Sequence, residues 1–527
     1  APESLSPFPI VEYAFRGNSD RANTFNRVLS ARDIPKPPQK MYVSLALTGK
    51  DIGRQSRQST SRSEQSPTER RRNRALIGLF LSIQSAKLNS RKTMTRIASG
   101  LLSVLIILMN AVASEKPGQP NSEFVSASTV DKIQSQMRKL PRDDIWWTVN
   151  GDDMAWNFKN LHQIFPTVNV YRNGPVRELE QRPITAIGEF IVDTPKGPMS
   201  FDDFIQSDQS TTMGVVVLHE GDIVYERYPR MQEYEKPVYW STSKVFPATI
   251  IRLLEERGEI DVSRPIDDYI PELAKSGFAG VSIRHILDMA SGLDCSDDYE
   301  NRDACYYVYS MAIGDGFRTE GAPDNPYEFV ASYDFVREAP PGTKFSYSGV
   351  NTFLLAWLVE EIMDMPFQDA FSKEIWYHIG AEADASYIAP RYGIAVTHGG
   401  FVSRMRDLAR FGLLFTPSYT VVSDRQIISD SHIELLRNGG NPTLLRHGGA
   451  SWPDAAGIKH NVYQWDAIFE NDNFFKGGWA GQGLIVNPTR DTVAVFTSYF
   501  KNDEYSEVAL EDKLFEVLED VFGKGSQ

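Results

Sequence analysis

The sequence predicts an α+β fold in which an antiparallel sheet is flanked by helices and joined to a mostly helical lobe. A β-rich hairpin lies over 213–228, and a second pair of strands lies over 483–498. The stretch 260–440 between them consists mostly of helical patterns and polar loops. If the two strand groups share one sheet, the helical stretch is an insertion that forms a second lobe beside it. The expected ligand site is then a cleft between the lobes.

Local patterns predict each element in chain order. Residues 213–219 are rich in β-branched side chains, Glu220-Gly221-Asp222 is a turn, and 223–228 returns with apolar alternation. Residues 241–258 have helical periodicity that stops at a glycine. The remaining expectations are helices around 285–293, 351–363 and 407–415, strands at 483–486 and 492–498, and a closing amphipathic helix at roughly 507–522.

Charge is divided unevenly along the 527 residues. The first 114 residues contain 18 Lys and Arg against 7 Asp and Glu, whereas the rest of the chain has a net charge of −25. A body this acidic repels phosphate, which argues against nucleic acid as a partner. Residues 1–93 show no sustained periodicity and are rich in Ser, Arg, Gln and Pro, so we expect a disordered basic segment there.

A targeting signal is expected at 94–113. Met94-Thr95-Arg96 precedes the apolar stretch 97–109 and an Ala-Val-Ala ending, which together are the parts of a secretory signal peptide. Because such a signal acts at the start of a chain, we expect Met94 to be the true start and 1–93 to be an over-extended gene prediction. The alternative is an uncleaved membrane anchor, since 17 residues are near the short limit for spanning a bilayer.

The folded domain is expected over 151–524, after a linker at 114–150, and in both cases it is periplasmic or secreted. Its two cysteines, Cys295 and Cys305, lie ten residues apart in an acidic, turn-rich stretch. In an exported protein they can close a disulfide loop, and two free thiols are the alternative. No histidine lies near them and their spacing is not that of a zinc site. We expect no metal and no cofactor.

A serine and a lysine three residues apart open the predicted helix 241–258. Residues at that spacing share one face of a helix, so Ser241 and Lys244 can touch. A serine hydroxyl is a weak nucleophile, and a lysine can act as its base when burial or a cationic neighbour lowers the lysine pKa. The N–H of Ser241 would also stabilise an oxyanion. Alternatively Ser241 is only a helix cap, and Pro247 predicts a later helix start or a bend.

The sequence around this serine resembles the serine β-lactamase and penicillin-binding-protein superfamily, which has three signature motifs, called boxes. It is most similar to the class C-like hydrolases, the branch that holds esterases and 6-aminohexanoate-dimer hydrolases. The resemblance spans roughly 150–522 and implies a β-lactamase/transpeptidase-like fold. The similar stretches are Trp240–Pro247, Ile283–Leu293, Pro340–Leu355 and Gly399–Leu414, and 154–179 resembles the nylon-oligomer branch.

The resemblance implies a second box, Y-x-N, which matches Tyr347-Ser348-Gly349. It makes Tyr347 the catalytic phenol that relays the proton of Ser241 to the leaving group. Gly349 stands where the pattern has asparagine. We therefore expect Ser348 or Asn351 to replace the missing amide contact.

The third box, K-T-G or H-x-G on a strand, matches Lys476-Gly477-Gly478-Trp479, the predicted substrate-binding residues. Lys476 would supply positive charge near Lys244 and Tyr347, or bind a substrate carboxylate. The glycines let the backbone approach a carbonyl, and the N–H of Trp479 would be the second oxyanion donor. Gly477 replaces the usual Thr or Ser. His447-Gly448-Gly449 is the less favoured alternative for this box.

Two classes of function compete. The first is an exported serine hydrolase that forms an acyl-enzyme on Ser241 and hydrolyses a small linear amide or ester; β-lactamase or D,D-peptidase activity ranks lower because both later boxes depart from the lactamase forms. The second is a non-catalytic binding module with the same fold, which Pro247, Gly349 and Gly477 would support. The sequence has no G-x-S-x-G elbow and no H-E-x-x-H motif, which argues against an α/β-hydrolase and a zinc peptidase. Membrane contact is expected only through an uncleaved anchor.

Overall fold

The computed structural model describes residues 150–299, 301–447, 457–502 and 510–523, together with Asp131 and Gln134. All of them belong to one compact unit. The expected basic segment, the signal or anchor segment and nearly all of the expected linker lie outside the described residues. None of the described helices is long and apolar enough to cross a bilayer.

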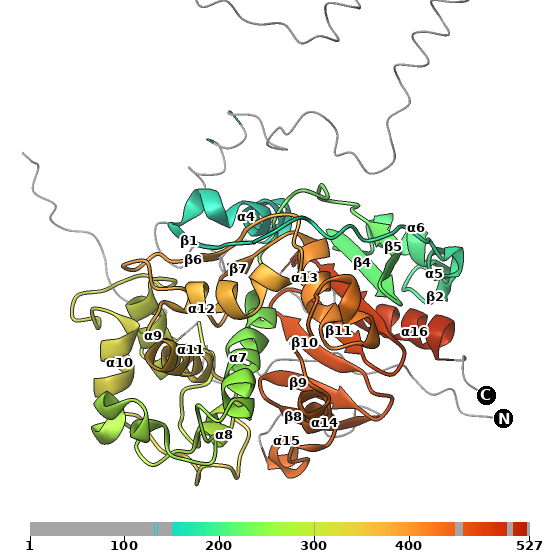
Figure 1. The fold of residues 1–527 in the computed structure, drawn as a ribbon. Helices are drawn as coiled ribbons and strands as arrows, with labels where there is room; N and C mark the ends of the chain where they lie inside the picture. The colour runs from blue at the N-terminus through green and yellow to red at the C-terminus, as the bar shows by residue number, and fades with distance from the viewer. Residues whose placement is uncertain are drawn as a thin grey trace, which may run out of the picture. The chain divides into compact units, whose positions relative to one another are not determined.

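A seven-stranded antiparallel sheet forms the centre of this unit, and Figure 1 shows it beside the helices. Its strand order is β5-β4-β12-β11-β10-β9-β8. The N-terminal hairpin pairs with the C-terminal strands through β4 and β12, where Val215 lies opposite Phe496. This pairing confirms that the two strand groups share one sheet. The strands are β4 (Gly214–His219), β5 (Asp222–Arg227), β8 (Ile458–Val462), β9 (Trp465–Phe469), β10 (Phe474–Gly478), β11 (Gln482–Asn487) and β12 (Thr492–Thr497).

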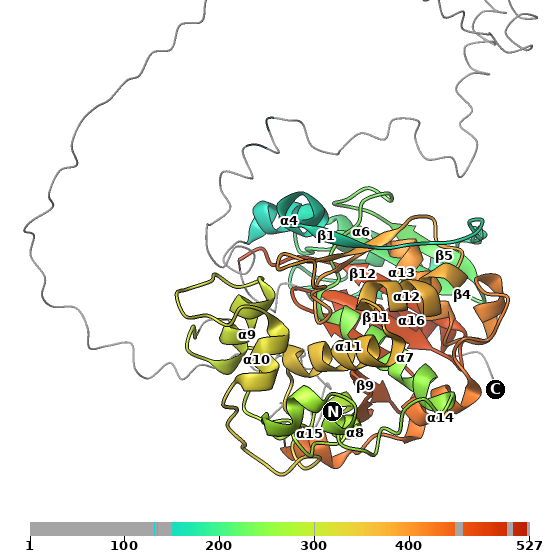
Figure 2. The same ribbon diagram turned by 60° about the vertical axis from the view of Figure 1, so that its left-hand side comes forward.

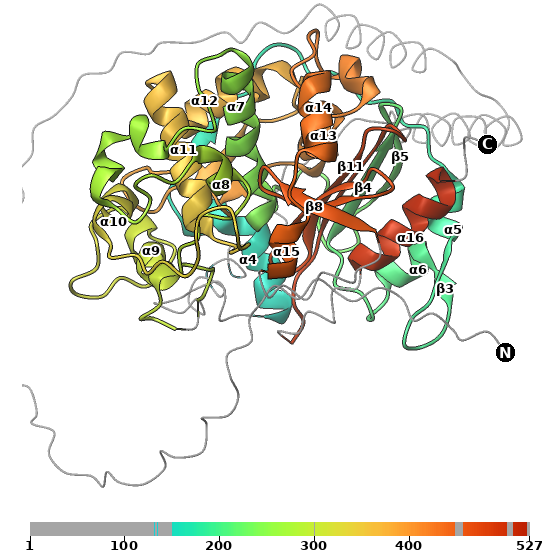
Figure 3. The same ribbon diagram turned by 90° about the horizontal axis from the view of Figure 1, so that it is seen from below.

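Helices cover both faces of the sheet, as the view from below shows (Figure 3). On β4, Val215 and Val217 pack into one apolar cluster with α16 (Leu510–Phe522), α5 (Thr185–Glu189) and α6 (Phe201–Gln206). Val216 and Leu218 point the other way, into the cluster that includes α13 (Met405–Leu413). Burial on both faces explains why this strand is a continuous apolar run rather than an alternating one.

The second lobe is built around α11 (Gly349–Met363), which lies across the middle of the lobe beside α7 in Figure 2. Every α11 residue from Gly349 to Val359 is buried, as expected of a helix surrounded by others. The helices around it are α7 (Val245–Glu256), α8 (Ile283–Leu287), α9 (Cys305–Ile313), α10 (Pro326–Ser332) and α12 (Phe367–Glu374), with α14 (Asp430–Asn438) and α15 (Thr443–His447) nearer the sheet edge.

The stretch 260–440 contains two short strands besides its helices and loops. It contributes β6 (Ala385–Ile388) and β7 (Phe401–Val402) to a small antiparallel sheet with β1 (Thr167–Val170), which follows α4 (Gly151–Ile164). A two-stranded sheet of β2 (Ile191–Val192) and β3 (Met199–Ser200) lies between α5 and α6 in sequence.

The predicted helix 241–258 is divided into two pieces. Trp240–Lys244 forms a 3₁₀ turn, η1, and the α-helix α7 begins at Val245 and ends at Glu256. Pro247 is therefore the third residue of α7. In the first turn of a helix the N–H groups have no partner within the helix, so proline is tolerated there. The late helix start predicted from Pro247 is confirmed.

Candidate active site

Ser241 and Lys244 lie on the 3₁₀ turn η1 and are in contact. Lys244 Nζ donates a hydrogen bond to Ser241 Oγ over 3.1 Å. Trp240, just before the serine, has φ of +46°, a left-handed conformation uncommon outside glycine. Within η1, Ser241 is only partly buried while Lys244 is fully buried. A reachable hydroxyl against a buried amine is the arrangement that a nucleophile and its base require.

The surroundings of Lys244 make it lose its proton at a lower pH than an exposed lysine does. Burial, opposed by Asp297 and assisted by the positive charge of Lys476, lowers the pKa of Lys244 from its ordinary value to about 8. Its Nζ also donates to the backbone carbonyl of His398 over 2.8 Å. That bond holds the amine in place in either protonation state. At neutral to mildly alkaline pH, Lys244 can therefore accept a proton from Ser241.

Tyr347 lies between two lysines. Its hydroxyl oxygen accepts a hydrogen bond from Lys476 Nζ over 3.1 Å. Lys244 Nζ is 4.9 Å from the centre of the Tyr347 ring, and Lys476 Nζ is 4.8 Å from it. Tyr347 comes from the loop before α11 and Lys476 from β10, so two distant parts of the chain meet beside η1.

Lys476 is fully buried and pairs within the protein. It forms an ion pair with Asp466 on β9, and Asp466 also accepts a hydrogen bond from the N–H of Gly477 over 3.0 Å. Two roles were predicted for Lys476, and its placement favours the one in which it supplies positive charge next to Tyr347. A substrate carboxylate would have to compete with Asp466 for a buried ammonium, so the carboxylate-binding role finds no support.

Gly478 brings β10 against the turn that carries the nucleophile. A Cβ atom built at Gly478 would overlap the carbonyl oxygen of Tyr239. Only glycine permits this approach. Trp479, the next residue, is partly buried, and its ring packs edge-on against that of Trp240 with centroids 5.6 Å apart. The expected roles of the Ser241 and Trp479 N–H groups as oxyanion donors stay predictions.

The second box differs from the expectation for Gly349. Ser348 caps α11 by accepting from the N–H of Val350, and Asn351 Nδ2 contacts the sulfur of Met289. The group placed against Lys244 is a carboxylate instead, with Asp297 Oδ2 3.7 Å from Nζ. Ser348 and Asn351 each contact other groups of the second lobe, and their expected role in replacing the missing amide contact stays a prediction.

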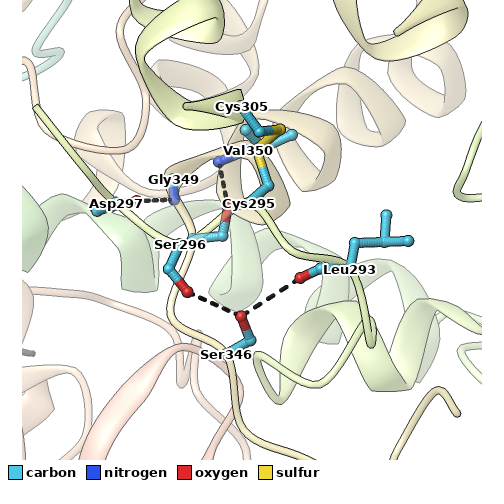
Figure 4. Close-up of a disulfide and its surroundings, with 9 residues drawn as sticks. Leu293, Cys295, Ser296, Asp297, Cys305, Ser346, Gly349 and Val350 are labelled. Carbon is cyan, nitrogen blue, oxygen red and sulfur yellow. Dashed lines mark hydrogen bonds between the residues drawn. A yellow bond between two sulfur atoms is a disulfide. The ribbon is translucent and has the colours of Figure 1, made fainter. Parts of the chain in front are cut away.

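Cys295 and Cys305 form a disulfide with their Cα atoms 5.1 Å apart. The predicted disulfide is therefore confirmed, and the alternative of two free thiols is wrong. Figure 4 shows it next to the start of α11, with Asp297 just beyond it in the loop. Three groups around Lys244 and Tyr347 were missed from the sequence: Asp297, Asp466 and the His398 carbonyl. The available signals were an acid inside the cysteine loop and a lone acid within the apolar strand β9.

The alternative third box at His447 falls largely outside the described residues. The His398 side chain is buried, with Tyr309 on Nδ1 at 3.0 Å and Asp315 on the Nε2 side at 3.3 Å. Among the described residues, no group of three or more His, Cys, Asp or Glu side chains is placed to hold a metal ion.

Comparisons with known proteins identify similar sequences and a similar fold. Residues 200–516 match the family described as Beta-lactamase. A 6-aminohexanoate-dimer hydrolase from Paenarthrobacter ureafaciens is 26% identical over 344 residues, which cover 64% of this chain and 84% of the relative. A β-lactamase from Providencia stuartii is 24% identical over 215 residues, 39% of this chain and 50% of the relative. A solved Bacillus anthracis structure with a provisional 6-aminohexanoate-dimer hydrolase name shares the fold, with a TM-score of 0.63 at 23% identity over 74% of this chain and 99% of that one.

Proposed function

Because the chain belongs to the β-lactamase family of serine hydrolases, we propose that it is an exported enzyme that forms an acyl-enzyme on Ser241 and hydrolyses a linear amide or ester. The observation that carries the proposal is the 3.1 Å hydrogen bond between Lys244 Nζ and Ser241 Oγ. The second lysine and Tyr347 complete a path for the proton beside that pair.

The acylation step follows from this arrangement. Neutral Lys244 takes the proton of Ser241 as Oγ attacks the substrate carbonyl carbon, and a tetrahedral oxyanion forms. The bond from that carbon to the leaving nitrogen or oxygen then breaks. The proton on Lys244 returns to the leaving group through the Tyr347 hydroxyl, whose negative form is stabilised by the nearby ammonium of Lys476. An ester remains on Ser241.

Deacylation reverses the same path with water. Lys244, neutral again, accepts a proton from a water molecule that attacks the acyl carbon, either directly or through Tyr347. The bond between the acyl carbon and Oγ breaks, Ser241 regains its proton, and the acid product leaves. One base therefore serves both half-reactions.

A linear amide or ester is favoured over a β-lactam by the third box. Gly477 has no hydroxyl to contact a substrate, whereas the lactamase forms of this box have Thr or Ser there. The relative from P. ureafaciens bears the name of a hydrolase for a linear amide dimer. Export is proposed from the expected signal at 94–113, and the disulfide Cys295–Cys305 supports it because disulfides persist in oxidising compartments.

A fluorophosphonate probe tests the nucleophile directly. We expect the intact protein to gain one phosphonyl adduct on Ser241 and Ser241→Ala to gain none while its unfolding midpoint stays within experimental error. Ser243 offers a matched control, because its hydroxyl is buried and bonds to the carbonyls of Trp240 and Thr397. Ser243→Ala should still be labelled at Ser241. Labelling of Ser241→Ala, or none of the wild type, would contradict the assignment and favour a non-catalytic module.

Substrate class is tested by side-by-side turnover. We expect p-nitrophenyl esters and the linear dimer of 6-aminohexanoate to be hydrolysed faster than a chromogenic cephalosporin. The physical reason is that Gly477 offers no hydroxyl in the third box, and Gly349 no amide in the second, where the lactamase forms of these boxes have them. Faster turnover of the cephalosporin would reverse the ranking while leaving Ser241 as the nucleophile.

A further inference from the structure

A carboxylate reaches Lys244 from a loop that no signature box includes. Asp297 Oδ2 lies 3.7 Å from Lys244 Nζ, and its Oδ1 accepts a hydrogen bond from the N–H of Gly349 over 2.6 Å. The backbone N–H of Asp297 donates to the carbonyl of Tyr347 over 3.2 Å. One residue is thus bonded to the start of α11 and to Tyr347, and it faces the base.

Gly349, the first residue of α11, supplies the N–H that binds this carboxylate. An anion is favoured at the start of a helix. The site also has no room for a side chain at Gly349, because a Cβ atom built there would lie 2.9 Å from the His398 ring and 2.9 Å from the Tyr306 hydroxyl. Asp297 occupies this place with a side chain that is 13% exposed.

The disulfide Cys295–Cys305 ties down both ends of the loop that carries Asp297 (Figure 4). Ser296, next to Asp297, shares a hydrogen bond with Ser346 over 3.0 Å, which joins the loop to the segment before Tyr347. The carboxylate is therefore held by a covalent tether, a side-chain bond and two backbone bonds. An exposed, untethered ion pair would contribute little.

We propose that Asp297 is a positioning residue that holds Lys244 in line with Ser241 and sets the pH at which this base works. The inference rests on the proposed function of Ser241. Four charged groups meet here: Lys244 and Lys476 carry positive charge, and Asp297 and Asp466 carry negative charge. The phenols of Tyr299 and Tyr306 also lie near Asp297, and burial, with a smaller contribution from the Asp297 charge, raises their pKa.

The charge of Asp297 opposes loss of the proton from Lys244. Replacing Asp297 with asparagine keeps an acceptor for the Gly349 N–H and removes the charge. Two lysines then face one acid, so the pKa of Lys244 should fall further. Opposite charges at this range shift a pKa by about 1–3 units, so we expect the acid limb of the pH–rate profile to move down by about one pH unit or more.

The test measures the rate of fluorophosphonate labelling at Ser241 against pH for the wild type, Asp297→Asn and Asp298→Asn. Asp298 is a matched control in the same loop, where it accepts from the N–H of Asn301. We expect a lower midpoint for Asp297→Asn and an unchanged midpoint for Asp298→Asn. A residue that only supported the fold would change the maximal rate and leave the midpoint in place. An unchanged or higher midpoint in Asp297→Asn overturns the proposal.

A second readout does not depend on activity. The pH at which Lys244 titrates can be read from unfolding stability, by comparing Asp297→Asn with the double variant Asp297→Asn/Lys244→Met. The titration midpoint from this pair should be lower than the midpoint obtained by comparing the wild type with Lys244→Met. A fall without any labelling of the wild type would refute the proposed nucleophile while supporting Asp297 as the partner of Lys244. Labelling of the wild type with no shift of the midpoint in either readout would support Ser241 as the nucleophile and refute the role of Asp297.

The tether is tested with the Cys295→Ser/Cys305→Ser double variant, which keeps the carboxylate and opens the loop. If the disulfide holds Asp297 near Lys244, the opened loop should move the midpoint in the same direction as Asp297→Asn and by a smaller amount. A midpoint equal to that of the wild type would overturn the part of the proposal that concerns the tether.

Discussion

Replacing Lys244 with methionine should make the stability of the protein respond differently to pH. The pKa of Lys244 falls from 10.5 to about 8 on folding, mainly through burial. Each pKa unit corresponds to about 1.4 kcal/mol, so this shift amounts to about 3 kcal/mol. Methionine has a similar shape and no charge. The variant lacks the hydrogen bonds that Lys244 donates to Ser241 and to the His398 carbonyl, which changes its unfolding free energy by the same amount at each pH.

Whether the unfolding free energy rises or falls with pH depends on which state, folded or unfolded, holds the proton of Lys244. Below pH 8 Lys244 is protonated in both states, so the difference in unfolding free energy between the wild type and Lys244→Met is constant. Between about pH 8 and 10.5 the folded protein has released the proton and the unfolded chain still holds it. The stability of the wild type then rises with pH relative to the variant, by about 3 kcal/mol over the window.

Urea unfolding followed by tryptophan fluorescence at several pH values from 6 to 10.5, with the disulfide intact, measures this difference. Lys275→Met is the matched control, because Lys275 is exposed and its ammonium is in water in both states. Its curve should run parallel to that of the wild type. A flat difference for Lys244→Met between pH 8 and 10.5 would mean that folding does not lower the pKa of the proposed base, and the mechanism would lose its proton acceptor.

Two further substitutions test the neighbours of the nucleophile. Tyr347→Phe should lower the turnover rate about 10²–10⁴-fold, the usual contribution of general acid–base catalysis, while Ser241 stays open to slow labelling; turnover equal to the wild type would remove Tyr347 from the proton path. Gly478→Ala should destabilise the fold by about 1–3 kcal/mol and reduce turnover, because its Cβ overlaps the Tyr239 carbonyl oxygen. Gly399→Ala, whose Cβ would lie at an ordinary 3.5 Å from the Trp240 ring, should be nearly neutral in thermal unfolding, and equal effects of the two alanines would contradict the argument.

Elements whose contacts join residues close together in the chain could be predicted from the sequence. The hairpin expected at 213–228 is β4 and β5, and the strands expected at 483–486 and 492–498 are β11 and β12. The contact of Ser241 with Lys244 belongs to the same class, because a spacing of three residues places both side chains on one side of a single turn. Pro247 even indicated that the α-helix starts late.

Only the tertiary structure decided which distant groups surround that pair. Asp297 lies 53 residues beyond Lys244 in the sequence, yet its carboxylate reaches the base because a disulfide and the bare N–H of Gly349 hold the loop there. Asp466 forms an ion pair with Lys476 across neighbouring strands, a contact that no local pattern indicated. Backbone geometry sets contacts within one turn, so a local pattern determines them. Contacts between lobes depend on how whole elements pack, and no local spacing records that packing.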